Sequence, residues 1–215
     1  MPVTISTAQE FHILTVCTGN ICRSPLAEQY IRAGLAAGGV TSASVSSAGT
    51  LAQPGQDMPP QAWALATSHG LEPGTHAARR ISERDVREAD VVLAMGREHR
   101  KEVAQLHPRA ARRTFTLREF ARLALGMTTD DLASAAALPL DDQAGRLRAA
   151  IAAVAARKGL VEAAADPLDD DVVDPYRRSD ATYARSGREL VPAADVFIKI
   201  LAVAATITDE SRRTS

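Results

Sequence analysis

The sequence contains little cysteine, few aromatic residues and no excess of charge of either sign. Two cysteines among 215 residues are too few for a disulfide framework or, by themselves, for a structural zinc site. Lys and Arg number 25 against 26 Asp and Glu, so nothing favours nucleic acid or a membrane surface as a partner. No apolar run approaches the roughly 20 residues that span a bilayer, and Met1–Glu10 shows no export signal. Composition therefore predicts a cytoplasmic globular protein.

Short β-rich runs alternate with helical segments, which is typical of a parallel sheet covered by helices on both faces. We expect strands at 11–16, 45–48, 89–95 and 113–117, and helices at 26–37, 59–69, 96–106, 143–158 and 181–207. Val196, Ile200 and Val203 are expected to form the buried stripe of the last helix. The length predicts one domain, residues 8–208, with an Ala-rich insertion at about 127–165 and flexible ends at 1–7 and 209–215.

The first strand runs into a polar loop, Cys17 to Pro25, that leads directly into the first helix. Ser24 fits the N-cap of that helix, and Pro25 fits its first position, where a missing N–H costs nothing. In such a loop the backbone N–H groups and the helix dipole converge on one point. This arrangement predicts an anion site at the carboxyl end of the strand.

Side chains in the same loop add the chemistry of a phosphate site with a nucleophile. Gly19 and Asn20 readily adopt the left-handed backbone that a tight curl needs. Arg23 offers a planar fork for two oxygens of a tetrahedral oxyanion. Positive potential at the floor of the loop favours the thiolate of Cys17, and the Ser24 hydroxyl can donate a hydrogen bond to it. The loop therefore predicts a charged sulfur nucleophile facing a bound phosphate.

The run Val16-Cys17-Thr18-Gly19-Asn20-Ile21-Cys22-Arg23-Ser24-Pro25 resembles the signature of the low-molecular-weight protein tyrosine phosphatases, in their bacterial form. Segments 47–50, 76–79, 89–95 and 97–99 are also similar to that family. The resemblance implies an α/β three-layer sandwich with a four-stranded parallel sheet of order 2-1-3-4. It further implies that the phosphate loop follows strand 1 and that neither metal nor other cofactor takes part.

The resemblance also assigns roles to individual residues. Cys17 corresponds to the nucleophile, Arg23 to the phosphate-binding arginine and Ser24 to the serine that stabilises the thiolate. Ser47 and His76 correspond to residues that help Asn20 to support the loop. For Cys22 two interpretations stay open: a small buried filler, or a redox partner that forms a reversible disulfide with Cys17. The phosphate-binding loop implied in this way comprises Thr18, Gly19, Asn20, Ile21, Cys22 and Ser24.

Two Asp-Pro dipeptides compete for the proton donor that a leaving oxygen needs, because a residue before proline is held in extended backbone. Asp174-Pro175 is followed by Tyr176, which matches the family's acid loop, whereas Asp166-Pro167 lacks the aromatic residue. We assign the acid to Asp174. Tyr176 and Leu51 are expected to line the substrate slot, and residues 169–171 to form a solvated surface loop.

The sequence departs from the family pattern at three places. Leu51 stands where many relatives resembling the eukaryotic enzymes carry tryptophan, and Arg177-Arg178 stands where a second tyrosine is expected, which puts cations at the rim of the slot. The segment at 127–165 is longer than the usual connection to the acid loop. We expect this insertion to pack beside the mouth of the active site and to restrict substrate size.

The predicted substrate is a phosphotyrosine-containing protein or a small aryl phosphate, with a kinase as a further possible partner. Three alternatives are open to different degrees. An arsenate reductase of the same fold relays a disulfide among three cysteines and is disfavoured, since only Cys17 and Cys22 exist. A protein-arginine phosphatase carries threonine where Ile21 stands. A non-catalytic phosphate-binding module needs neither Cys17 nor Asp174.

Overall fold

The computed structural model of the chain describes residues 10–72 and 74–208; the ends expected at 1–7 and 209–215 lie outside the described residues. Short helices at 83–88, 117–124 and 133–136 were not expected from the sequence, whereas most other elements begin and end within about two residues of their expected bounds. The elements are β1 (Phe11–Cys17), α1 (Arg23–Ala37), β2 (Ala43–Gly49), α2 (Pro60–Ser68), α3 (Glu83–Glu88), β3 (Val91–Ala94), α4 (Arg97–Leu106), η1 (Pro108–Arg113), β4 (Thr114–Thr116), α5 (Leu117–Ala124), η2 (Asp130–Leu132), α6 (Ala133–Ala136), α7 (Gln143–Ala156), η3 (Pro167–Asp170) and α8 (Asp180–Thr206).

The four strands form one parallel sheet of order β2-β1-β3-β4, which confirms the predicted topology. The strand β1 lies at the centre, paired with β2 on one side and β3 on the other. Its last residue, Cys17, is opposite Gly49 of β2, and Val16 is opposite Ala94 of β3. The carboxyl ends of the three strands therefore meet where the predicted phosphate loop begins.

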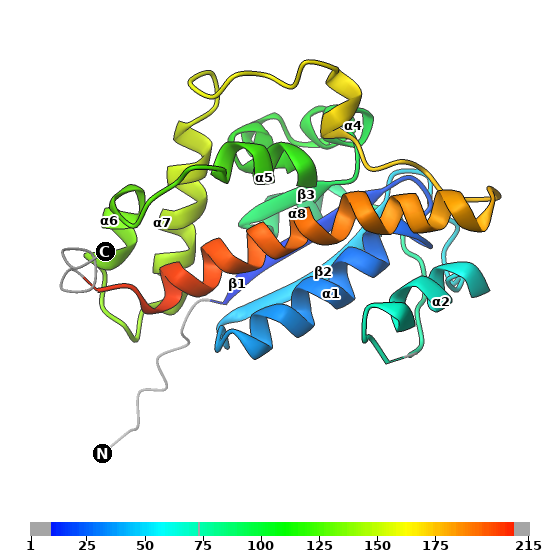
Figure 1. Cartoon of the computed structure of the whole chain (residues 1–215), viewed down its shortest axis with the longest axis horizontal. Helices are drawn as coiled ribbons and strands as arrows, with labels where there is room; N and C mark the ends of the chain where they lie inside the picture. Colours follow the sequence, from blue (N-terminus) through cyan, green and yellow to red (C-terminus); the bar gives the residue numbers. More distant parts are fainter. Residues whose placement is uncertain (1–9, 73, 209–215) are drawn as a thin grey trace.

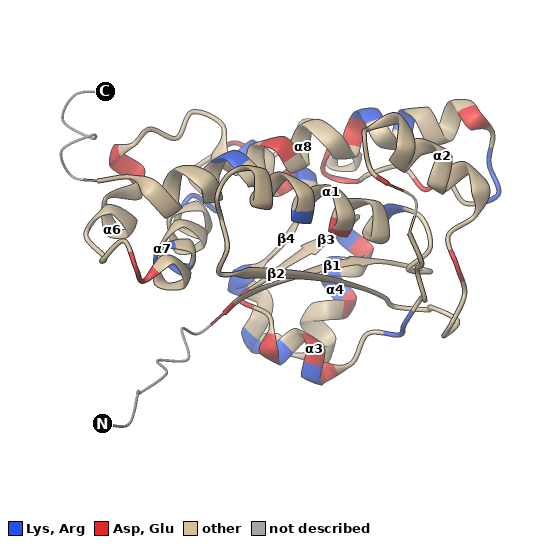
Figure 2. Ribbon diagram, turned by 90° about the horizontal axis from the view of Figure 1, so that it is seen from below, with Lys and Arg blue, Asp and Glu red and all other residues tan. Residues whose placement is uncertain are grey.

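Helices cover both faces of the sheet, so the molecule has three layers (Figures 1 and 2). Alternate residues of β1 point to opposite faces: Ile13 belongs to a cluster shared with α1, α5, α7 and α8, whereas Leu14 and Val16 belong to a cluster shared with α3 and α4. Figure 2 shows α1, α2 and α8 on one side of the strands and α3 and α4 on the other. The buried strands are thus apolar on both faces, as the sequence predicts.

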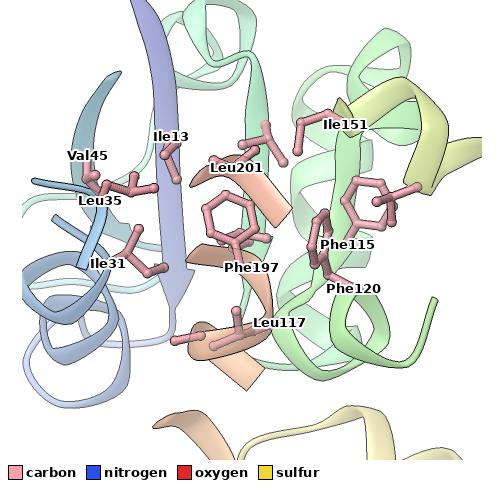
Figure 3. Packing of buried hydrophobic residues seen from close by; sticks show 14 of the residues in the cluster. Ile13, Ile31, Leu35, Val45, Phe115, Leu117, Phe120, Ile151, Phe197 and Leu201 are labelled. Carbon is pink, nitrogen blue, oxygen red and sulfur yellow. The ribbon is translucent and has the colours of Figure 1, made fainter. Parts of the chain in front are cut away.

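Three phenylalanines join β4, α5 and α8 in the larger cluster (Figure 3). The ring centroids of Phe115 and Phe120 lie 5.4 Å apart, and those of Phe120 and Phe197 lie 4.9 Å apart, both edge to face. All three side chains are fully buried. Edge-to-face pairs of this kind add to the free energy of apolar burial and hold α8 against the sheet.

The predicted buried stripe of α8 was wrong by one position. Val196, Ile200 and Val203 are half-buried, and the fully buried side chains in this second half of the helix are Phe197 and Leu201 with neighbouring alanines. Both sets of residues repeat at helical spacing, and the second half of α8 is apolar around most of its circumference. No helix of the described residues is both long and apolar enough to cross a membrane.

The expectation that the insertion packs beside the active-site mouth was also wrong. Its longest helix, α7, buries Leu147 and Ile151 against the core and binds the amino ends of the strands. The Arg148 guanidinium contacts the carboxylate of Asp90 at 2.8 Å and the carbonyl of Glu10 at 3.2 Å. Figure 1 shows α6 and α7 at the end of the molecule opposite α2. The apolar stripe of α7 fits the exposed core at that end, whereas the phosphate loop lies at the carboxyl ends of the strands.

Candidate active site

The end of β2 fixes the backbone at the start of the phosphate loop. Thr50 and Leu51 donate their backbone N–H groups to the carbonyl oxygens of Cys17 and Thr18, each at 2.9 Å. A Cβ on Gly49 would lie 2.5 Å from the Thr18 carbonyl oxygen. Only glycine allows the two backbones to approach this closely, so the pairing of β1 with β2 sets the position of the loop.

Asn20 supports the curl of the loop from inside. It has a φ of 55°, the left-handed backbone predicted for it, and is fully buried. Its Nδ2 donates to Ser24 Oγ at 3.0 Å and to Ser47 Oγ at 2.8 Å, and its Oδ1 accepts from the Arg79 N–H at 2.9 Å. His76 Nε2 lies 2.5 Å from the Asn20 carbonyl oxygen. The structure thus brings Ser47 and His76 to the one strained residue of the loop.

Two local predictions about the loop were wrong. Gly19 does not adopt the left-handed backbone, which Asn20 alone takes up in this part of the loop. Ser24 is not the N-cap, because α1 begins at Arg23 after Cys22. Its hydroxyl lies instead 3.0 Å from the Cys17 sulfur, since the loop turns its side chain inward.

Hydrogen-bond donors gather around the sulfur of Cys17, which is 2% exposed. The Asn20 N–H donates to it at 3.3 Å, and the Ser24 hydroxyl lies within hydrogen-bond distance. The sulfur therefore lies at the floor of the loop, with two polar groups of the loop directed at it.

Arg23 lies beside the sulfur and is only 5% exposed. Its Nη1 donates to the Val172 carbonyl at 3.1 Å, and its Nη2 forms an ion pair with Asp174 Oδ2 at 2.9 Å. Among the described residues no group accepts a hydrogen bond from its buried Nε. An unpaired buried N–H of this kind is costly unless a ligand satisfies it, and a tetrahedral oxyanion would do so.

Long-range ion pairs hold the segment before Asp174. The Asp170 carboxylate pairs with Arg122 at 2.7 Å, and Asp171 accepts the backbone N–H of Arg97 at 2.8 Å. The prediction of a solvated loop was therefore wrong for Asp170 and Asp171, although Asp169 is exposed. These pairs join the segment to α5 and α4, which places the acid loop over the phosphate loop.

The structure separates the two candidate acids. Asp174 lines the cleft above Cys17, and its side chain is 52% exposed. Asp166 is exposed and caps η3 by accepting the Leu168 N–H at 2.9 Å; it does not line this cleft. Only Asp174 is therefore placed to reach a bound phosphate ester.

The cleft above the loop has a volume of about 190 Å³. Tyr176 and Leu51 form part of its rim, and the Arg177 guanidinium lies 5.1 Å from the centre of the Tyr176 ring. Gln53 and Gln56 line it as well, which no local sequence pattern indicated. The cleft is lined by Cys17, Thr18, Gly19, Ile21, Cys22, Arg23, Leu51, Gln53, Gln56, Asp174 and Tyr176.

A site could also lie in a second cavity or at a cluster of metal-ligating side chains. A larger cavity of about 680 Å³ lies between α7 and η1, lined by Arg148 and Lys158 among others, but no residue of the signature loop reaches it. Within residues 10–72 and 74–208, no group of three or more His, Cys, Asp or Glu side chains could hold a metal ion. The cleft above Cys17 is therefore the candidate active site.

Comparison with known families settles the relationship that this geometry suggests. The family model for low molecular weight phosphotyrosine protein phosphatase matches residues 12–131, more than half of the chain. The chain belongs to this family. The match includes the signature loop, Ser47 and His76, and it ends before Asp174 and α8.

Individual members of the family agree with this assignment. EpsP of Ralstonia solanacearum, a low molecular weight protein-tyrosine-phosphatase by name, is 36% identical over 107 residues, covering 50% of this chain and 70% of its own. A low molecular weight protein tyrosine phosphatase from T. tengcongensis superposes with a TM-score of 0.62 at 26% identity, over 88% of this chain and 99% of its own. The YwlE arginine phosphatase from Geobacillus stearothermophilus shares the fold, with a TM-score of 0.60 at 23% identity, over 88% and 91%.

His99 is a residue at this phosphatase site that the sequence analysis missed. It is 1% exposed, and its Nε2 lies 2.9 Å from Thr18 Oγ1 in the loop. Burial, together with the nearby Arg23 cation, lowers the pKa of His99 to about 4. The ring is therefore neutral near pH 7 and holds the side chain of Thr18. His99 lies on the buried face of α4, in the first turn after β3. This position in the sequence could have indicated that it lies near the carboxyl ends of the strands.

Replacing His99 with glutamine is expected to remove an acid-dependent loss of stability. In the unfolded chain the pKa of His99 is the ordinary value of 6.5, against about 4 in the folded chain. The unfolded chain therefore binds the extra proton between these values, and the free energy of unfolding falls as pH drops through this window. By about pH 4.5 the wild type should lose roughly 2–3 kcal/mol more than His99→Gln, relative to pH 7.5. Urea unfolding at the two pH values measures this, and equal losses in both proteins would contradict it.

Cys22 is a buried residue of the loop at the edge of the cleft, and both cysteines are free thiols. Its sulfur is 3.8 Å from the Tyr183 hydroxyl. Burial raises the pKa of Cys22 to about 12, so this thiol stays protonated at neutral pH. The two sulfurs of this phosphatase loop therefore lie in different environments, one surrounded by donors and the other desolvated.

Proposed function

We propose that this protein hydrolyses phosphomonoesters, above all phosphotyrosine in proteins and small aryl phosphates, through a cysteinyl-phosphate intermediate. One observation carries the proposal: the Cys17 sulfur, the Arg23 guanidinium and the Asp174 carboxyl line a single cleft, with Arg23 Nε free to donate. A nucleophile, an oxyanion fork and a proton donor are what phosphoryl transfer to sulfur requires. Binding alone would need only the fork and the amides.

In the first step the Cys17 thiolate attacks phosphorus as the bond to the leaving oxygen breaks. The loop N–H groups and Arg23 hold the three equatorial oxygens of the transferring phosphoryl group. Arg23 Nη2 pairs with Asp174 at 2.9 Å; a bound phosphate takes over that N–H and frees Asp174. Asp174, once released from the ion pair, takes up a proton from solvent and gives this proton to the leaving oxygen.

In the second step water attacks the phosphocysteine. Asp174, now a carboxylate, takes a proton from the water as the new oxygen–phosphorus bond forms and the sulfur–phosphorus bond breaks. The Cys17 thiolate leaves, stabilised by the Ser24 hydroxyl at 3.0 Å and the Asn20 N–H at 3.3 Å. Inorganic phosphate and the resting enzyme result. Ser47 and His76 act through Asn20 and keep the loop curled throughout.

Phosphotyrosine is favoured over phosphoarginine by the walls of the cleft. Ile21 is buried at the loop, and Tyr176 and Leu51 stand at the rim. Apolar and aromatic walls stack on a phenyl ring, whereas a guanidinium leaving group needs hydrogen-bond acceptors. Protein-arginine phosphatase activity is the second candidate, supported by the shared fold with YwlE; Ile21, where such a phosphatase carries threonine, speaks against it.

A matched pair of peptides separates these two candidates. A phosphotyrosine peptide is expected to give a kcat/KM at least about tenfold above that of the same peptide with phosphoarginine. Ile21→Thr should lower this ratio several-fold, because it removes an apolar contact and adds a hydroxyl. Phosphate release is measured for both peptides with wild type and Ile21→Thr. A ratio below one in the wild type would select the arginine phosphatase instead.

Two further parts of the proposal concern the setting of the enzyme. The free thiols fit a reducing compartment, and we propose the cytoplasm. The partner is a phosphotyrosine protein together with the kinase that phosphorylates it. After peroxide oxidises Cys17 to a sulfenic acid, Cys22 can displace its hydroxyl as water to form a disulfide that prevents overoxidation. Because burial raises the pKa of Cys22 to about 12, this closure is slower than attack by a free thiolate.

A further inference from the structure

A second depression lies next to the catalytic cleft and shares one residue with it. This groove, which we call the arginine groove, has a volume of about 600 Å³ and is lined by Val173, Asp174, Arg178, Ala181, Thr182, Arg185 and Arg188. Asp174 also lines the catalytic cleft. The two depressions therefore meet at the proposed general acid, and a chain leaving the cleft can cross directly into the groove.

The arginines of the groove come from one face of α8 and from the loop before it. Thr182, Arg185 and Arg188 recur every third residue, which places them on the same side of the helix. Arg178 reaches the groove from the loop that follows Tyr176. Figure 2 shows basic positions in this loop and along the first half of α8. Secondary structure thus aligns the three cations beside the acid loop.

Two of these guanidinium groups have no partner in the part of the chain that the structure describes. Arg185 pairs with Glu189 at 2.7 Å, and Glu189 also accepts the Val173 N–H at 2.8 Å, so this pair anchors the acid loop. The side chains of Arg178 and Arg188 are exposed and make no hydrogen bond or ion pair with any residue that the structure describes. Both are therefore free to bind an anion.

Acidic residues near the groove do not cancel this charge. Asp174 is paired with Arg23, Glu189 with Arg185, Asp170 with Arg122 and Asp171 with Arg97. The exposed acids that remain are Asp180 at the start of α8 and Asp169, which lines a neighbouring cavity together with Arg188. Arg177, over the Tyr176 ring, adds a further cation at the border between groove and cleft. The whole chain has a net charge of −1, so the local excess of arginine is a property of this surface.

We propose that the arginine groove binds a second anionic side chain, a carboxylate or another phosphate, on the peptide that carries the scissile phosphotyrosine. This proposal rests on the proposed function and specifies its substrate class. A guanidinium fork matches the paired oxygens of either anion. An extended peptide advances about 3.3 Å per residue, so the anion lies a few residues from the phosphotyrosine. A peptide is the occupant because the groove opens into the cleft at Asp174.

Three phosphotyrosine peptides of one length test the groove. One carries glutamates on both sides of the phosphotyrosine, the second glutamines, and the third non-hydrolysable phosphonate side chains in place of the glutamates. They are assayed with wild type, with Arg178→Glu/Arg188→Glu and with the control Arg109→Glu/Arg112→Glu. The control makes the same charge change at exposed arginines of η1. Each kcat/KM is divided by that protein's own value for para-nitrophenyl phosphate, which does not reach the groove.

Wild type should prefer the glutamate peptide over the glutamine peptide by about 3- to 10-fold, with the preference falling as salt is added. The groove variant should lose this preference, and the control should keep it. Comparison of the phosphonate peptide with the glutamate peptide shows whether the groove binds a phosphate-like group or a carboxylate more tightly. The proposal would be overturned if the wild type did not prefer the glutamate peptide over the glutamine peptide. It would also be overturned if the groove variant and the control variant lost this preference to the same extent. Absence of para-nitrophenyl phosphate turnover would instead refute the proposed function; binding of the three peptides to Cys17→Ser, measured by fluorescence anisotropy, then decides the groove separately.

Discussion

Turnover of an aryl phosphate is expected to disappear when Cys17 is replaced by serine. A serine hydroxyl is not ionised near neutral pH, so the substitution keeps the shape of the loop and removes the charged nucleophile. The loss in kcat should be at least about 10⁴-fold, comparable to the loss of a nucleophile in other covalent catalysts. The measurement is para-nitrophenol release from para-nitrophenyl phosphate, together with binding of inorganic phosphate. Binding should persist, because the loop amides and Arg23 remain.

Cys22→Ser is the matched control for this prediction, since it makes the same substitution five residues along the same loop. Its loss should stay below about tenfold, because Cys22 supplies a backbone N–H and buried volume. If Cys17→Ser still hydrolysed the aryl phosphate, Cys17 would not be the nucleophile. Equal losses in the two variants would mean that the loop had been disturbed as a whole.

Asp174→Asn is expected to lower kcat by about 10²- to 10⁴-fold, which is the usual value of a positioned general acid. Asparagine keeps the size of the side chain and cannot give up a proton to the leaving oxygen. The loss should be greatest for phosphotyrosine, whose phenol has a pKa of about 10, and smaller for para-nitrophenyl phosphate, whose leaving group is more acidic. Single-turnover rates with the two substrates measure the difference.

Asp166→Asn provides the control, because the other Asp-Pro dipeptide lies outside the cleft. It is expected to change kcat by less than about twofold, with at most a small loss of stability from the cap of η3. If Asp166→Asn lowered kcat strongly and Asp174→Asn did not, Asp166 would be the general acid. If Asp174→Asn slowed both substrates equally, the carboxylate would act by holding Arg23 rather than by protonating the leaving group.

The part of the site that lies within one short segment could be predicted from the sequence. The run from Cys17 to Ser24 encodes its own strand end and its left-handed Asn20, and these local signals were sufficient to expect an anion site, although the helix begins two residues earlier than expected. The Asp-Pro-Tyr triplet at 174–176 was recognisable for the same reason. The order of the strands came from the family resemblance rather than from any local signal.

The features that could not be predicted depend on partners far away in the sequence. Asp171 binds Arg97, 74 residues earlier, and nothing around Asp171 distinguishes it from a solvated carboxylate. His99 meets Thr18 across 81 residues. In α8, two apolar stripes differ by one position, and only the packing of Phe197 against Phe120 decides which is buried. The insertion likewise carries an apolar stripe that does not indicate which end of the sheet it covers.

The central claim is that the sulfur at the floor of the loop becomes phosphorylated during turnover. Rapid mixing of the enzyme with an excess of aryl phosphate, quenching in denaturant at alkaline pH, where a sulfur–phosphorus bond is stable, and peptide mass analysis test this claim most directly. The account predicts a burst of phenol that approaches one per chain, with one phosphoryl group on the peptide that contains Cys17 and none in Cys17→Ser. Steady phenol release without a burst, or phosphate on any other side chain, would contradict it.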